Sequence, residues 1–218
     1  MKRVLVLVEG ATEEALVHRL LKPHFWQHGK AIEPTRVCTR REAGRRAHRG
    51  GIATYAKVRH DLLVLLRSRP HAVTTLFDYY ALPRDFPGVS TLPKGVSCFE
   101  RAAHVERALQ GDIGDPRLIA NLVLHEVEGL LFSLPRAIAE VLLDDGRAKE
   151  LTAIAAAYAS PEEIDDGPET HPSRRIEALL PRYQKALHGP LIAERIGLGA
   201  MRAKCRHFDA WMTRIETL

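Results

Sequence analysis

The chain has 218 residues, a formal net charge of +5 and a sequence pI of about 9.3, and this length fits one large α/β domain or one domain with a helical appendage. Its three cysteines are far apart and form no CxxC pair, which argues against a disulfide framework or a zinc ribbon and fits a reducing, cytoplasmic location. No run approaches the roughly 20 apolar residues of a membrane span, and the first apolar run is unlike a signal peptide, so we expect no membrane association.

Short apolar runs alternate with amphipathic segments through the first half of the chain. Residues 4–8 are five consecutive apolar residues, a pattern typical of a fully buried strand. Similar patterns predict further strands at 32–38, 72–77 and 117–124, and helices at 12–28, 52–68 and 98–110. Because strands separated by helices pair in parallel, we expect an α/β fold with a central parallel sheet and helices on both faces.

The second half of the chain is expected to be helical. We expect a long helical region at 130–158 and a connection rich in Pro, Gly and Asp at 160–172. Two further helices are expected at 173–188 and 201–216. We therefore expect an α/β core over residues 1–133 and a helical extension over 134–218, packed on the core as one compact unit.

Three of the expected strands end in an acidic residue, namely Glu9, Asp78 and Glu126. The carboxyl ends of parallel strands share one edge of the sheet, where open α/β proteins bind their ligands, and neighbouring strand ends lie about 5 Å apart. Carboxylates gathered there repel one another, and protonation or a divalent cation relieves the repulsion. Oxygen ligands of this kind suit Mg²⁺ or Mn²⁺, so the pattern predicts a metal site that can activate water for phosphoryl transfer.

Glu13 lies one helical turn beyond Glu9 and is the fourth expected ligand. Each acid also has a structural explanation. An acid in a first helical turn is favoured by the helix dipole, Asp78 suits the cap of a turn, and Glu128 is interpreted as a solvent-facing helix residue. The coincidence of three strand ends is what favours a functional site.

Other catalytic and binding templates are missing from the sequence. No GxGxxG follows the first strand, and no GxxxxGK[ST], HExxH or GxSxG occurs. The sequence therefore does not support a dinucleotide site or a phosphate-binding loop for ATP. It also does not support a zinc protease motif or a nucleophile elbow.

The acidic segments lie in a familiar order. Val8-Glu9-Gly10-x-Thr12-Glu13-Glu14 resembles the first motif of Toprim domains, especially those of OLD-family nucleases. Later segments resemble successive blocks of a Toprim-like bacterial family labelled domain of unknown function 4276, namely 77–88, 125–133, 172–175 with 183–185, and 205–211. The resemblance spans nearly the whole chain and implies a Toprim-like α/β fold.

The resemblance also implies roles for individual residues. In Toprim enzymes the first-motif Glu and the second-motif acids bind Mg²⁺, which implies that Glu9 and Asp78 are catalytic metal ligands. Lys185 of the fourth block is the third expected catalytic residue, as a group that stabilises charge at the scissile phosphate. Tyr80 stands where a Toprim domain has a second acid, so either Glu126, Glu13 or Asp85 supplies the missing oxygen or the metal site is weakened.

Basic residues are concentrated in one expected loop and in the fourth block. Such clusters contact nucleic-acid phosphates and make binding depend on salt; a solvated loop that only maintains solubility explains the first cluster equally well. The expected nucleic-acid-binding residues are Arg40, Arg41, Arg45, Arg46, Arg49, Arg174 and Arg175.

These observations lead to one preferred function and two alternatives. We expect an Mg²⁺-dependent nuclease that acts on DNA or RNA, with a role in phage defence or genome maintenance and a separate ATPase partner implied by the resemblance. The alternatives are a non-catalytic nucleic-acid or protein interaction module on the same scaffold, for which Tyr80 would mark a lost site, and a metal-dependent phosphohydrolase of small nucleotides.

Overall fold

A computed structural model describes residues 1–37, 52–164, 167 and 170–218. Its centre is a parallel sheet in which β1 (Lys2–Val8) lies between β2 (Lys30–Arg36) and β3 (Ala72–Asp78). The second strand begins and ends two residues earlier than expected, while β1 and β3 follow the predicted runs closely. The predicted α/β fold with a parallel sheet is confirmed.

The expected strand at 117–124 is interrupted in the middle. It forms two short segments, β4 (Leu118–Ile119) and β5 (Leu122–Val123), which both pair in parallel with β3 and keep one register. At the interruption, the Thr75 side chain pairs with the backbone of Asn121 in place of a hydrogen bond between the two strands. Its Oγ1 donates to the carbonyl oxygen of Asn121 at 2.6 Å and accepts from the Asn121 amide at 2.9 Å.

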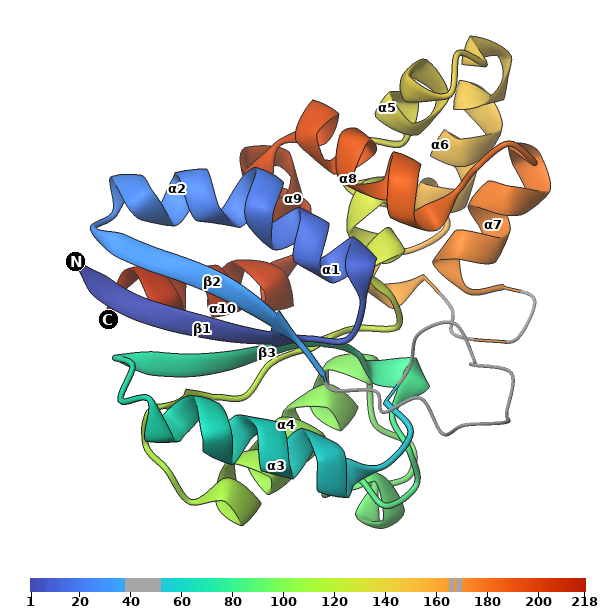
Figure 1. Ribbon diagram of the computed structural model, residues 1–218. Helices are drawn as coiled ribbons and strands as arrows, with labels where there is room; N and C mark the ends of the chain where they lie inside the picture. The colour runs from blue at the N-terminus through green and yellow to red at the C-terminus, as the bar shows by residue number, and fades with distance from the viewer. Residues whose placement is uncertain (38–51, 165–166, 168–169) are drawn as a thin grey trace, which may run out of the picture.

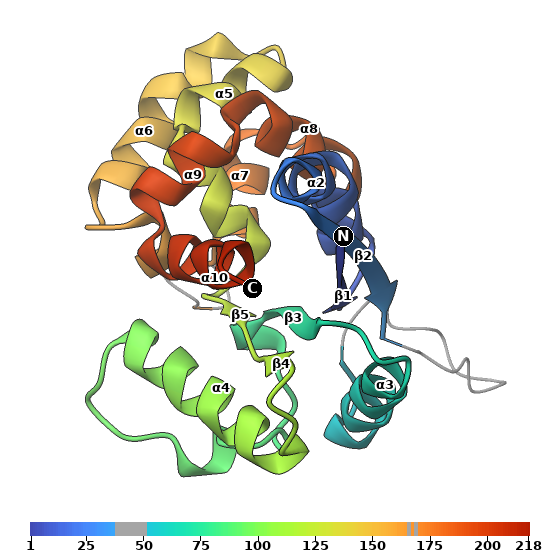
Figure 2. The same cartoon turned by 90° about the vertical axis from the view of Figure 1, so that its left-hand side faces the viewer.

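Helices cover both faces of this sheet (Figures 1 and 2). One face carries a continuous helical segment made of α1 (Ala11–Leu16), a π-helical turn (Val17–Leu21) and α2 (Lys22–Gln27). The other face carries α3 (Tyr55–Arg67) and α4 (Cys98–Ile113). The side chains of β1 alternate between the two cores as the strand period of two requires: Val4, Val6 and Val8 belong to the first, and Leu7 to the second.

The C-terminal helices pack on the same face as α1 and α2. They are α5 (Pro135–Val141), α6 (Ala148–Ala156), α7 (Pro172–Leu179), α8 (Lys185–Ile196), α9 (Leu198–Lys204) and α10 (Arg206–Glu216). Trp211 of α10 reaches the sheet, where its Nε1 donates to Thr74 Oγ1 at 2.8 Å. This half of the chain therefore shares its hydrophobic core with β1 and α1.

Two expected long helices are each broken in two. The expected helix at 173–188 ends at Leu179, and α8 begins only at Lys185, because Pro181 restricts the residue before it to extended conformations. The expected helix at 201–216 is divided between α9 and α10 at Cys205. Short 3₁₀ turns occupy Tyr79–Ala81, Val89–Thr91, Val127–Ser133, Asp145–Arg147 and Pro161–Glu163. In the described part of the chain, every helix is too short or too polar to cross a membrane.

The Thr75 bridge generates a stability prediction. Thr75→Val keeps the shape of the side chain but leaves the buried amide and carbonyl of Asn121 without this partner, so we expect a loss of about 1–3 kcal/mol in the free energy of unfolding. Urea unfolding followed by circular dichroism measures the loss. The matched control is Thr152→Val on α6, an exposed threonine bonded only within its own helix, which should change stability by less than about 0.5 kcal/mol. Equal effects of the two substitutions would contradict the bridging role.

Candidate metal centre

Five acidic residues and one lysine lie together at the carboxyl edge of the sheet, and we refer to them as the acidic centre. Glu9 follows β1, Asp78 ends β3, and Glu126 follows β5, so three strand ends converge as the sequence pattern predicts. The other members come from α1, from the 3₁₀ turn after β5 and from the first residue of α8; they are Glu13, Glu128 and Lys185. The charge of Lys185 acts on each of the five carboxylates.

Lys185 lies among the carboxylates. Its Nζ is 2.8 Å from Glu128 Oε2, 3.5 Å from Asp78 Oδ2 and 3.7 Å from Glu126 Oε1. Burial alone would lower its pKa, but the surrounding carboxylates raise it well above the ordinary value. Lys185 therefore keeps its proton at neutral pH. Its side chain is still 35% exposed, so it can be reached from solvent.

Glu9 and Glu13 are connected by the turn between β1 and α1. The Gly10 amide donates to Glu13 Oε2 at 2.8 Å, and a Cβ at Gly10 would lie 3.2 Å from that same oxygen, so the glycine leaves the room the carboxylate needs. Burial and the Asp78 carboxylate raise the pKa of Glu9 to about 7 and that of Glu13 to about 8. Glu9 Oε2 is buried and has no hydrogen-bond partner.

Asp78 and Glu126 are held by backbone donors. Asp78 Oδ1 accepts from the Val127 amide at 3.0 Å, and burial raises the Asp78 pKa even though Lys185 opposes the shift. Burial would also raise the pKa of Glu126, but Lys185 and the donors of Ser173 lower it overall. Glu126 Oε2 accepts from the Ser173 amide at 2.9 Å and lies 3.2 Å from His171 Nδ1. Glu126 thus also holds the start of α7.

Glu128 is a member of the acidic centre that the sequence interpretation missed. It was expected on a solvent-facing helix surface, but it is fully buried and its Oε1 accepts from the Tyr183 hydroxyl at 3.2 Å. Burial raises its pKa to about 7 against the effect of Lys185. Glu128 lies in the 3₁₀ turn that begins directly after Glu126, and no strand or helix period in the sequence indicated that the two carboxylates would lie together.

The residue at position 80 does not contribute to the acidic centre. Tyr80 is 47% exposed and its ring stacks on His171, with ring centroids 5.5 Å apart. Of the three candidates for the missing oxygen, Glu13 and Glu126 lie in the acidic centre. Asp85 lies elsewhere, where it accepts from the Tyr55 amide at the start of α3.

The predicted nucleic-acid-binding residues are only partly described. Arg40, Arg41, Arg45, Arg46 and Arg49 lie outside the described residues. Arg174 is exposed on α7 and pairs with Glu177 at 3.0 Å. The guanidinium of Arg175 donates to the Thr170 carbonyl and, at 2.8 Å, to the Tyr158 hydroxyl. These contacts of the two arginines are with residues outside the acidic centre, and their role in binding nucleic acid stays a prediction.

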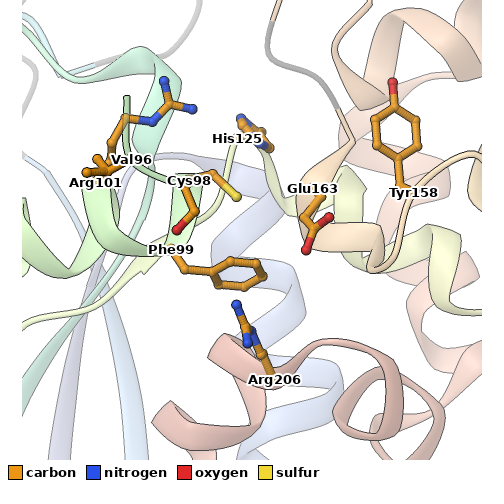
Figure 3. Close-up of a pocket in the computed structure, with 9 residues that line it drawn as sticks. Val96, Cys98, Phe99, Arg101, His125, Tyr158, Glu163 and Arg206 are labelled. Atoms are coloured by element: carbon orange, nitrogen blue, oxygen red, sulfur yellow. The ribbon is translucent and has the colours of Figure 1, made fainter. Parts of the chain in front are cut away.

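A cavity of about 530 Å³ is lined by residues of α4, of α10 and of the segment that leads from β5 to Glu126 (Figure 3). His125, which directly precedes Glu126, lines it, together with Arg101 of α4 and Arg206 of α10. Arg206 lies over the Phe99 ring at 3.8 Å, and Arg101 Nε is buried without a hydrogen-bond partner. Within the described residues, neither arginine forms an ion pair within 4 Å. The cavity therefore presents two cationic groups, and the carboxylate of Glu163 is part of the same lining.

The donor set fits a hard divalent cation in its chemistry. Five carboxylates exceed the charge of one lysine, and one buried oxygen of Glu9 has no partner. The carboxylates do stand apart around Lys185: within the described residues, no three of them bring ligand atoms mutually within 4.8 Å. A cation that binds there would have to draw the carboxylate side chains toward it and share the space with the ammonium group.

Comparisons with known proteins identify a family. The sequence model of the family described as domain of unknown function DUF4276 matches residues 8–216. Comparison with curated protein sequences gives no match. Among solved structures, the chain is similar to the C-terminal region of the OLD protein of Burkholderia pseudomallei, with 16% identity, a TM-score of 0.46, and coverage of 100% of this chain and 98% of that one. The same region of the Xanthomonas campestris pv. campestris OLD protein gives 17% identity, a TM-score of 0.37, and 98% coverage of each chain.

The raised pKa values predict how stability depends on pH. The folded protein keeps protons on Glu9 and Glu13 up to pKa values of about 7 and 8, whereas an ordinary glutamate loses its proton near 4.5. Between those values the folded state binds more protons, so the free energy of unfolding should fall as the pH rises. Urea unfolding without divalent cations at several pH values measures this slope.

The matched variant for this prediction is the double substitution Glu9→Gln with Glu13→Gln. It removes both titrating groups and should make the slope shallower between about pH 5 and pH 8. Asp78 and Glu128 shift in the same direction and leave a remaining slope. A wild-type stability that is flat or rises over this range would contradict the raised pKa values.

Proposed function

Because the chain belongs to the family described as domain of unknown function DUF4276, a description that assigns no activity, we propose its function from the chemistry of the acidic centre. The proposed function is divalent-metal-dependent hydrolysis of phosphodiester bonds in nucleic acid, DNA or RNA. The observation that carries it is the gathering of five carboxylates and one lysine at the carboxyl edge of a parallel sheet, the edge at which open α/β proteins bind ligands.

Mg²⁺ or Mn²⁺ is the proposed cofactor. One ammonium group cannot balance five ionised carboxylates, and burial makes their ionisation costly, so in the absence of a metal ion the pKa values of Glu9, Glu13 and Glu128 are raised. Carboxylate oxygens are the ligands these ions prefer. When bound, such an ion supplies Lewis-acid polarisation of the phosphate and an activated water. Glu9, Glu13 and Asp78 are the proposed ligands, with Glu128 and Glu126 beside them.

Lys185 supplies the positive charge of the chain itself. Its pKa is raised, so the ammonium group persists at neutral pH, and its partial exposure lets it donate to a phosphate oxygen. Negative charge that develops on the phosphate during cleavage would be stabilised there. Ser173 and His171 hold Glu126 in position, and Tyr80 stacks on His171. In this proposal Tyr80 supports the orientation of an acid instead of replacing one.

The cavity lined by Arg101 and Arg206 supports a polyanionic substrate. A phosphate backbone that crosses the acidic centre needs cationic contacts outside it, since the carboxylates repel it. Arg101 and Arg206 line the cavity from different sides, and His125, one residue before Glu126, is also part of its lining (Figure 3). Arg174 and the basic segment at residues 40–49 are proposed to extend these contacts. A separate ATPase partner and a role in phage defence or genome maintenance are further parts of the proposal.

Cleavage of supercoiled plasmid tests the catalytic proposal. We expect Mg²⁺- or Mn²⁺-dependent nicking by the wild type and a loss of at least ~100-fold in Glu9→Gln, because an oxygen ligand becomes a neutral amide. The matched control is Glu14→Gln. Glu14 lies next to Glu13 in the first turn of α1 but accepts from Arg36 Nε at 2.8 Å, so nicking should be unchanged. Identical behaviour of wild type and Glu9→Gln would sink the nuclease proposal.

The same assay separates the two alternatives. A phosphohydrolase of small nucleotides would release phosphate from nucleoside triphosphates and leave plasmid and single-stranded RNA intact. An interaction module would bind nucleic acid with no cleavage under any metal. Cleavage of a polynucleotide that depends on Glu9 and Lys185 supports the nuclease against both.

The cationic cavity generates a prediction about binding. In Ca²⁺ or in chelator, Arg101→Ala and Arg206→Ala should each weaken the affinity for single-stranded or duplex DNA. Each should also reduce the slope of log affinity against log salt by about 1, because one phosphate contact is lost. Fluorescence anisotropy at several salt concentrations measures both quantities. Arg136→Ala is the control, since Arg136 is exposed on α5 and pairs with Glu140. A slope unchanged in both cavity variants would show that DNA does not contact this cavity.

A further inference from the structure

A second group of ligating side chains lies at the opposite edge of the sheet, where α2 meets the end of α10. His24 and His28 are four residues apart on α2, and Glu216 is the last residue of α10. One ligand atom from each residue lies within 4.8 Å of the other two. The imidazole rings of the two histidines lie against each other, with centroids 4.4 Å apart. The group brings nitrogen ligands together, which the acidic centre does not.

Two of the three side chains are held by a second contact of the kind that orients metal ligands. His28 Nδ1 lies 2.9 Å from the His24 carbonyl oxygen and donates to it, which leaves His28 Nε2 as the acceptor nitrogen. Both oxygens of Glu216 accept from Arg202, Oε2 from Nη2 at 3.0 Å and Oε1 from Nη1. The Glu216 carbonyl also accepts from Lys30 Nζ at 2.7 Å, so the end of α10 is fixed against the start of β2.

Two positive groups lie beside the three ligands, and both are already paired. Arg202 pairs with Asp209 and Glu216, and Lys30 donates to the backbone carbonyls of Glu216 and His28. Burial would raise the pKa of Glu216, but the hydrogen bonds from Arg202 and His24 lower it overall, so the carboxylate is ionised at neutral pH. The side chains of His24 and Glu216 are 21% and 16% exposed, and His28 is exposed, so an ion reaches the group from solvent.

We propose that His24, His28 and Glu216 form a second metal site, for Zn²⁺ or a similar borderline divalent ion, with solvent completing the coordination. Two histidines and one glutamate are a ligand set that zinc uses, and imidazole nitrogen favours zinc over Mg²⁺. The ion takes the place of the proton between His24 Nε2 and Glu216 Oε1, which now lie 2.6 Å apart. Tetrahedral bonds of about 2.0–2.2 Å separate ligand atoms by about 3.3 Å, so this pair opens by less than ~1 Å.

The competing explanation is an ion pair between His24 and Glu216 that fastens α10 to α2 without metal. His28 separates the two explanations, because among the described residues its side chain bonds and stacks with His24 and takes no part in the ion pair. An ion pair needs His24, Glu216 and Arg202 and is indifferent to His28. A metal site loses one of its three protein ligands when His28 is removed.

The experiment is a Zn²⁺ titration of the full, tag-free chain in excess Mg²⁺, which occupies sites made of oxygen ligands. Side-chain NMR signals of the histidines report which imidazoles bind, and competition with a zinc chelator gives the affinity. We expect saturable shifts of His24 and His28. We expect His28→Ala to weaken the affinity by at least ~10-fold, and the control His18→Ala, an exposed histidine on the same helical segment, to leave it unchanged.

The outcomes of this experiment can be distinguished from misfolding, and they do not depend on the activity of the acidic centre. Without zinc, His28→Ala should keep the wild-type thermal midpoint, because the Arg202–Glu216–His24 contacts remain. Unshifted His24 and His28 signals at saturating Zn²⁺ would overturn the proposal, as would equal affinities of His28→Ala and His18→Ala. Plasmid cleavage plays no part in this readout, so a failed nuclease assay leaves this test unaffected.

Discussion

The ion contacts of Lys185 are the interaction on which the rest of the site depends. Glu128 is completely buried, and breaking a buried ion pair by removing one partner costs about 3–5 kcal/mol. Because Lys185 begins α8, its ammonium group attaches that helix to the carboxyl edge of the sheet, beside the contacts of Ser173 with Glu126 and of Tyr183 with Glu128. The carboxylates in turn come from β1, α1, β3 and the turn after β5. The position of α8 and the charge balance of the acidic centre therefore depend on each other.

The backbone that delivers Glu126 and Glu128 is itself under strain. His125 has a φ of 62°, in the left-handed region that non-glycine residues adopt at a cost of about 1–3 kcal/mol. The turn it makes directs the chain from the end of β5 into the acidic centre, where Asp78 accepts from the Val127 amide. The Thr75–Asn121 bridge holds the preceding interruption of the strand in register. Side-chain contacts to β3 thus compensate for a short and irregular last strand.

The sequence was informative where chemistry follows from local pattern. Buried runs that end in an acid placed Glu9, Asp78 and Glu126 at one edge, since parallel strands leave no other arrangement. The contacts of Lys185 with Asp78 and Glu128 join residues far apart in the chain, and no local pattern encodes them. Glu128 was misjudged because an amphipathic helix was expected where an extended residue and a 3₁₀ turn occur. Pro181 signalled the break before α8, but not that the break would aim Lys185 at the sheet.

The two ends of the sheet differ in ligand chemistry, and this difference has a physical basis in the fold. At the carboxyl edge, strand ends deliver short acidic side chains into a buried space, which suits an ion that prefers oxygen and tolerates few other partners. At the amino edge, α2 and α10 meet near the surface, and residues one helical turn apart present two imidazoles to the carboxylate of a second helix. The oxygen ligands of the first set suit Mg²⁺, and the imidazoles of the second favour an ion such as Zn²⁺ over Mg²⁺. The sheet between them keeps the two sets apart, so the chemistry of one edge can change without altering the charge balance that Lys185 maintains at the other.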